Sequence, residues 1–150
     1  MDNQSTDHTW EIMQSYKTHF PDKVKIFKLD RHTAGPGAGR NLGLKNAKAD
    51  FIGFADADDY FEYNAFEIMY SKAVNENCDL IYAASYDVNE VKYKVTRRLR
   101  LGSREEILTV GSMVFWNKLV RRSLFDIVGE IPEDMVFEDL AFCLCVIKKQ

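Results

Sequence analysis

The sequence predicts one α/β domain that contains some parallel sheet. Stretches with the apolar spacing of a helix alternate along the chain with short apolar runs that are typical of strands. The clearest run, Phe51–Ala55, is uninterrupted, as expected of a strand buried on both faces. A chain of 150 residues suffices for one core, and no linker interrupts it, so residues 1–150 are treated as a single domain.

In the first part of the chain, apolar spacing and turn residues define the expected elements. Apolar residues at helical spacing predict a helix over Thr6–Phe20, with Ser5 or Thr6 as its cap. The apolar residues that follow predict a strand over Val24–Leu29. Glycines and a proline within Asp30–Gly39 predict a loop, and a short helix is expected over Gly39–Ala47.

In the second part, Asn64 with Glu67 forms a capping-box pattern, which predicts a helix beginning at Ala65. The further elements are expected to be a strand over Leu80–Ala84, a strand over Lys92–Leu101, a short helix opened by Ser103 with Glu106, a partly helical segment over Trp116–Phe125 and a final helix from about Glu138.

Composition excludes several classes of protein. The chain has 46% hydrophobic and 29% charged residues and a formal net charge of −3, so we expect no nucleic-acid partner. Its cysteines, Cys78, Cys143 and Cys145, have no metal-binding spacing and are interpreted as small buried hydrophobes in a reducing compartment. No apolar run approaches the roughly 20 residues of a membrane span. We therefore expect a cytoplasmic protein, at the inner face of the membrane in its full-length form through regions outside this chain.

An acidic turn follows the most buried-looking strand. Asp56, Asp58 and Asp59 stand where ligands bind in open α/β sheets, beyond the carboxyl end of a strand. Asp56 and Asp58 are two residues apart and can share a face, where they would repel unless a cation intervenes. Oxygen ligands favour a hard divalent cation, here Mn²⁺ or Mg²⁺. The alternative is an acidic turn that caps the next helix.

Stretches in chain order resemble the family 2 glycosyltransferases of the A-type fold. Asp2–Asp7 is similar to the family's Asp-Asp-Gly-Ser-x-Asp, and Gly35–Gly43 to its Gly-Gly-x-x-x-Ala-Arg-Asn-x-Gly. Phe51–Tyr60 resembles its Tyr-Ile-x-Phe-x-Asp-x-Asp-Asp signature. Trp116–Leu119, followed by Phe137–Leu140, resembles its Trp-Asn-Lys-Leu and Glu-Asp elements.

The resemblance implies an inverting transfer of a sugar from a nucleotide diphosphate, usually UDP, to an acceptor hydroxyl in cell-surface polysaccharide or glycan synthesis. It implies that Asp58 binds the metal, and that Asp56 contacts the ribose or shares the metal. Asp2 would contact the nucleotide base, and Arg40 would line the nucleotide pocket; Arg40 could instead pair with a nearby carboxylate.

The same resemblance implies that Asp139 is the catalytic base and that Glu138 beside it holds the acceptor, a glycan or lipid-linked molecule. The alternative for both is a pair of acids favoured by the dipole at the start of a helix. Two alternatives remain for the whole chain: a sugar-phosphate nucleotidyltransferase, or a truncated domain that catalyses no reaction.

The sequence also departs from the family pattern. Gln4 replaces a glycine, and the chain begins after the family's first two strands, so the expected fold is a partial A-type (Rossmann-like) glycosyltransferase fold that lacks them. Either the strands at Val24–Leu29 and Phe51–Ala55 then pair directly, or they keep unpaired edges. Unpaired edges recruit other chains, so self-association through exposed sheet edges is expected.

Overall fold

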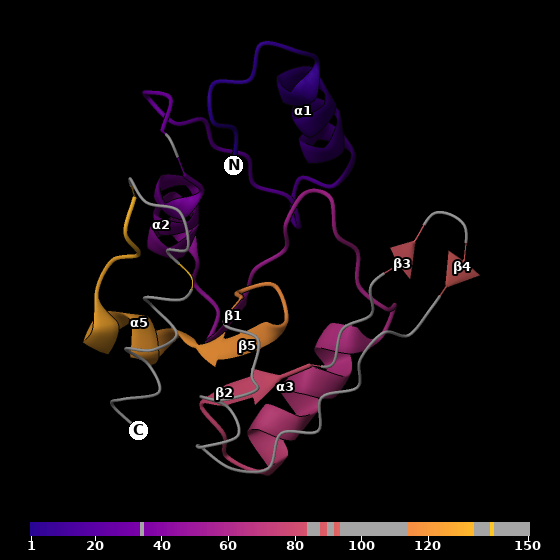
Figure 1. Cartoon of the computed structure of the whole chain (residues 1–150), viewed down its shortest axis with the longest axis vertical. Helices are drawn as coiled ribbons and strands as arrows, with labels where there is room; N and C mark the ends of the chain where they lie inside the picture. The colour runs from indigo at the N-terminus through magenta and orange to yellow at the C-terminus, as the bar shows by residue number, and fades with distance from the viewer. Residues whose placement is uncertain (34, 84–87, 90–91, 94–113, 134–138, 140–150) are drawn as a thin grey trace. The chain divides into compact units, whose positions relative to one another are not determined.

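The computed structural model describes residues 1–33, 35–83, 88–89, 92–93, 114–133 and 139 (Figure 1). These residues fall into two compact units. Unit 1 comprises Met1–Lys48 and Glu130–Glu138, and unit 2 comprises Ala49–Gly129 and Asp139–Gln150. Helices and short strands occur together, as the predicted α/β class requires.

Unit 1 contains helix α1 (Thr9–His19) and helix α2 (Gly37–Asn46), both close to their predicted positions. The predicted cap of α1 is wrong: the helix begins after His8, and it is the Asp7 carboxylate that accepts the Thr9 N–H, at 3.0 Å. A local side-chain acceptor therefore fixes the start of the helix at Thr9, three residues after the predicted start at Thr6.

The strand predicted over Val24–Leu29 is reduced to one parallel bridge between Asp2 and Lys28. The Asp2 N–H donates to Phe27 O at 2.8 Å, and the Leu29 N–H donates to Asp2 O at 2.9 Å. A strand is stabilised by a paired neighbour, and among the described residues of unit 1 only Asp2 pairs with this segment. The prediction of a strand is therefore right at this one bridge, but wrong for the rest of the segment.

Unit 2 contains a three-stranded sheet of β1 (Phe51–Gly53), β5 (Lys118–Arg121) and β2 (Leu80–Tyr82), in the order β1-β5-β2. Strand β5 is antiparallel to both neighbours, so this described sheet has no parallel pair. The parallel sheet expected from the sequence is represented in the described part of the chain by the Asp2–Lys28 bridge.

The segment Trp116–Phe125 is partly helical, as predicted, but its first half contains a strand. Lys118–Arg121 forms the central strand, and helix α5 (Arg122–Val128) begins directly after it. The sheet provides a partner on each side of these residues, and both Leu119 and Val120 are buried there. Pairing on two edges thus overrides the local sequence preference.

Helix α3 (Ala65–Asn75) occurs where it was predicted, but its capping box does not form. Asn64 is the N-cap and its side chain makes no capping hydrogen bond. Met69 and Ala73 of α3 pack with Ile81 and Leu119 to form the core of unit 2. Full burial of an aliphatic side chain contributes about 1.5–3 kcal/mol, so this packing holds α3 in place without the cap.

Strand β1 is only half-buried at Phe51 and Ile52, so burial on both faces is also wrong for the described structure. Strands β3 (Val88–Asn89) and β4 (Lys92–Tyr93) form a short antiparallel pair. Strand β4 lies at the start of the strand predicted over Lys92–Leu101, whereas β3 was not predicted. The rest of the strand expected over Lys92–Leu101, the helix at Ser103 and the final helix beyond Asp139 lie outside the described residues. In the described part of the chain, no helix is both long and apolar enough to span a bilayer.

Candidate functional site

The acidic turn follows β1, as predicted, with Phe54 and Ala55 between the end of the strand and Asp56. The Asp59 N–H donates to Asp56 O at 3.2 Å, which closes a turn through Asp58. Asp56 is half-buried, whereas Asp58 and Asp59 are exposed. The next helix begins at Ala65 with Asn64 as its cap, so the alternative that these acids cap that helix is wrong.

The carboxylates of Asp58 and Asp56 oppose the ionisation of Asp59. The pKa of Asp59 is raised, first by partial burial of its carboxyl group and then by the negative charges of Asp58 and Asp56. A divalent cation would relieve this repulsion, and carboxylate oxygens are the ligands that Mg²⁺ and Mn²⁺ prefer. Among the described residues, no three His, Cys, Asp or Glu side chains form a metal cluster. Binding of a cation by Asp56 and Asp58 therefore stays a prediction.

Asp2 is a buried charge in unit 1, with 1% of its surface exposed. Its Oδ1 accepts the Ser5 N–H at 3.1 Å, and its Oδ2 lies 3.4 Å from Lys28 Nζ. The hydrogen bond from Ser5, assisted by Lys28, lowers the pKa of Asp2 against the opposing effect of burial. Within the described structure Oδ2 accepts no hydrogen bond, so Asp2 retains one acceptor oxygen that only the lysine charge compensates.

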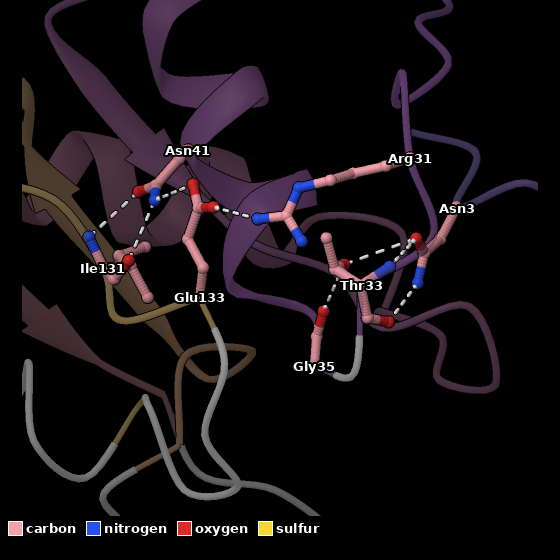
Figure 2. Close-up of polar contacts among 7 residues, drawn as sticks. All are labelled: Asn3, Arg31, Thr33, Gly35, Asn41, Ile131 and Glu133. Atoms are coloured by element: carbon pink, nitrogen blue, oxygen red, sulfur yellow. Dashed lines mark hydrogen bonds and ion pairs between the residues drawn. The ribbon is translucent and has the colours of Figure 1, made fainter.

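The residue after Asp2 makes a contact that sequence reasoning missed. Asn3 Oδ1 accepts the Thr33 N–H at 3.0 Å and lies 3.3 Å from the Thr33 hydroxyl, and Asn3 Nδ2 donates to Thr33 O at 2.9 Å (Figure 2). The same hydroxyl lies 3.1 Å from Gly35 O. One side-chain amide thereby fastens the Asp2 turn to the loop before α2.

Asn41 fastens α2 to the segment that contains Ile131. Its Oδ1 accepts the Ile131 N–H at 2.9 Å, and its Nδ2 donates to Ile131 O at 2.8 Å and to Glu133 Oε1 at 3.2 Å (Figure 2). The other carboxylate oxygen of Glu133 lies 3.8 Å from the Arg31 guanidinium. The sequence alone does not reveal this contact of Asn41, because its partners are about 90 residues away.

The remaining candidates are less closely defined. Arg40 is a half-buried residue of α2, and its N–H donates to Pro36 O at 3.0 Å. Asp139 is half-buried in unit 2, and Glu138 lies outside the described residues. The roles predicted for Arg40, Asp139 and Glu138 therefore stay predictions.

A buried cation in unit 2 was also missed. Lys118 of β5 is 3% exposed; its Nζ donates to Asn117 Oδ1 at 2.9 Å and also to Val114 O. The same ammonium lies 4.4 Å from the centre of the Tyr82 ring. The Trp-Asn-Lys-Leu motif thus has a structural function here, because it places a compensated charge inside the sheet.

Comparison with protein families identifies the chain. The family model described as glycosyl transferase family 2 matches residues 1–132. The chain belongs to this family. The resemblance inferred from the sequence motifs is thereby confirmed.

Curated relatives of this family 2 chain are named as glycosyltransferases or glycan-synthesis proteins. The chain is similar to the minor teichoic acid biosynthesis protein GgaA of Bacillus subtilis, with 33% identity over 109 residues, which is 69% of this chain and 24% of GgaA. It is also similar to the cholesterol galactosyltransferase of Borreliella burgdorferi, with 26% identity over 99% of this chain and 46% of that protein. The chain therefore spans less than half the length of these relatives.

Solved structures confirm the fold class. The crystal structure of Staphylococcus aureus TarS residues 1–349 in complex with UDP-GlcNAc matches 97% of this chain and 42% of that one, with a TM-score of 0.79 and 23% identity. The complex of the same TarS fragment with UDP matches with a TM-score of 0.78 and 24% identity, over 97% of this chain and 44% of that one. The described elements thus belong to an A-type glycosyltransferase fold.

Proposed function

We propose that this chain forms part of an inverting glycosyltransferase that transfers a sugar from a UDP-sugar to an acceptor hydroxyl in cell-surface glycan synthesis. The observation that carries the proposal is the acidic turn Asp56–Asp59, which follows the end of β1 in a chain of family 2. The TarS complexes with UDP-GlcNAc and UDP, and the teichoic acid role in the name of GgaA, support the donor and the glycan class.

In this proposal, each group of residues in the chain has a separate task. Asp58 and Asp56 would hold Mn²⁺ or Mg²⁺, which supplies positive charge against the departing diphosphate. Asp139 takes the proton of the acceptor hydroxyl, and Glu138 holds the acceptor beside it. Proton removal by Asp139 increases the negative charge on the attacking oxygen, and inversion follows if that oxygen attacks from the face opposite the diphosphate.

On the nucleotide side, Asp2 accepts a hydrogen bond from the base and Arg40 contributes to the nucleotide pocket. Because Asp2 is 1% exposed, the base reaches Oδ2 only when a neighbouring side chain moves. Lys28 is such a group, since its Nζ is 3.4 Å from Oδ2 and its side chain is 38% exposed. We propose that the base takes the place of this ammonium.

The proposed setting follows from the proposed substrates. The acceptor is a glycan or a lipid-linked molecule, and transfer occurs in the cytoplasm at the inner face of the membrane, because nucleotide sugars and lipid-linked acceptors meet there. Contact with the membrane would involve parts of the protein other than the residues described here.

Titration calorimetry tests the proposal with UDP, CDP, ADP and GDP, each with and without Mn²⁺. We expect UDP binding that requires the metal, because a cation would stand between the carboxylates of Asp56 and Asp58 and the negatively charged diphosphate. Asp58→Asn should abolish the metal dependence, whereas the matched control Asp126→Asn, at an exposed position of α5, should leave it unchanged. If Asp58→Asn binds UDP with the parent's affinity and metal dependence, Asp58 is not a metal ligand. If the parent chain binds no nucleotide, the alternative of a catalytically inert domain is favoured.

A further inference from the structure

The turn that contains Asp2 depends on residues distant in the sequence. On one side, the backbone of Asp2 is fixed by hydrogen bonds with Phe27 O and the Leu29 N–H, at 2.8 and 2.9 Å. These bonds fix Asp2 itself but not the turn that follows it. That turn passes through Gln4, which has a φ of 61°, a conformation that residues other than glycine rarely adopt. The turn therefore requires stabilising contacts from outside.

Asn3 provides such contacts. Its side-chain amide pairs with both the N–H and the carbonyl oxygen of Thr33, as the backbone of a neighbouring strand would (Figure 2). Thr33 is 4% exposed, so water has little access to replace the lost bonds if Asn3 is truncated. Gln4 adds a second contact, since its Nε2 donates to Leu29 O.

The conformation of this turn also determines the direction of the Asp2 carboxylate. The Ser5 N–H, on the far side of the turn, binds Oδ1 at 3.1 Å. When Oδ1 is held in this way, the direction of Oδ2 depends on the position of Ser5, and that position depends on the Asn3–Thr33 pair.

We propose that Asn3 is a positioning residue for recognition of the nucleotide base, through its control of Oδ2 of Asp2. The inference rests on the proposed function, in which Asp2 meets the base of a UDP-sugar. Uracil presents an N–H at ring position 3, which a carboxylate accepts, whereas cytosine presents a lone pair there, which a carboxylate repels. A correctly directed Oδ2 therefore favours UDP over CDP, and a misdirected Oδ2 does not.

The experiment compares the binding of UDP, CDP and inorganic pyrophosphate to this chain by titration calorimetry, each with Mg²⁺. We expect the parent chain to bind UDP about tenfold more tightly than CDP, the effect of one charge-assisted hydrogen bond. In Asn3→Ala the preference should fall to within about twofold, while pyrophosphate affinity stays unchanged because pyrophosphate has no base. A purely structural role would weaken all three ligands together.

Two further variants keep the test decisive. Thr33→Val has nearly the same shape, removes only the hydroxyl and should reduce the UDP preference partially, which matters if Asn3→Ala does not fold. Asn46→Ala is the matched control, because Asn46 donates to Leu42 O within α2 and should leave the preference intact. Full UDP preference in both Asn3→Ala and Thr33→Val would overturn the inference alone. A parent chain that binds UDP and CDP equally, or neither, would overturn the role proposed for Asp2 and the inference with it.

Discussion

The side chain of Asn41 pairs with both backbone groups of Ile131, which lies 90 residues later in the sequence. Its Oδ1 accepts the Ile131 N–H and its Nδ2 donates to Ile131 O, at 2.9 and 2.8 Å. Ile131 is 1% exposed, and within the part of the chain that the structure describes its two backbone groups form these hydrogen bonds with Asn41. Asn41 thereby joins helix α2 to the later segment of unit 1 that contains Ile131.

Truncation of Asn41 should therefore be costly. Asn41→Ala leaves a buried N–H and a buried carbonyl without partners, and we expect a loss of about 2–3 kcal/mol in the free energy of unfolding, measured with urea. Asn46→Ala, which removes one bond to Leu42 O on the same helix, should cost less than about 1 kcal/mol. If the two variants lose the same free energy of unfolding, the contact with Ile131 contributes no more to stability than the bond to Leu42 O.

Two glycines of α2 should respond in opposite ways to the addition of a methyl group. A Cβ at Gly37 would overlap the carbonyl oxygen of Pro132, which is backbone and cannot move aside easily. We expect Gly37→Ala to destabilise the chain by about 1–3 kcal/mol. At Gly39 the nearest atom is Met1 Cβ, at 3.6 Å, so Gly39→Ala should be neutral or stabilise by up to about 1 kcal/mol through helix propensity. Thermal melting of the two variants side by side checks this difference.

Gln4 combines backbone strain with a stabilising side-chain bond. Its φ of 61° costs about 1 kcal/mol in a residue other than glycine. Its Nε2 donates to Leu29 O, which offsets that cost. Gln4→Ala should destabilise the chain by about 1 kcal/mol because it keeps the strain and loses the bond, whereas Gln4→Gly should be nearly neutral because it loses both. If alanine proves as stable as glycine at this position in urea unfolding, the backbone is not strained there.

Protonation of Asp2 should destabilise unit 1. The pKa of Asp2 is lowered from its ordinary value of 3.8, first by the hydrogen bond with Ser5 and then with help from Lys28. Because the folded pKa lies below the unfolded one, the stabilisation is fully present above the unfolded pKa and is lost as pH falls below 3.8 through the folded pKa. Unfolding midpoints measured from about pH 5 to pH 2 should fall less steeply for Asp2→Asn than for the parent chain.

A control is needed for this pH dependence, because the pKa of Asp7 is also lowered, by its hydrogen bonds with Thr9. Asp7→Asn should remove a separate part of the acid sensitivity, at the start of α1. If Asp2→Asn and the parent chain lose stability in parallel over the whole acid range, the charge of Asp2 does not stabilise unit 1.

Strand β1 should promote self-association. In the described part of unit 2, β1 pairs with β5 on one edge and with no strand on the other. An unpaired edge presents backbone N–H and carbonyl groups to another chain. Multi-angle light scattering should show an average mass that increases with protein concentration. A constant monomer mass at every concentration would contradict this prediction.

The sequence by itself determined the elements whose signals are local. Apolar spacing located α1, the end of a glycine-rich loop located α2, and a capping-box pattern located α3. An uninterrupted apolar run located β1, and the acidic residues after it located the turn at Asp56–Asp59. The motifs in these segments were sufficient to indicate the family. Such signals are local because helix periodicity, turn residues and the end of a strand each involve residues that are neighbours in the chain.

The tertiary structure decided whatever depends on a distant partner. Lys118–Arg121 forms a strand because β1 and β2 lie on either side of it. Helix α3 forms without a capping hydrogen bond from the Asn64 side chain, because core packing holds the helix in place. The amides of Asn3 and Asn41 acquired their functions from Thr33 and Ile131, which are 30 and 90 residues away. A hydrogen bond requires donor and acceptor within about 3 Å, and for residues so far apart only the folded backbone brings the two groups that close.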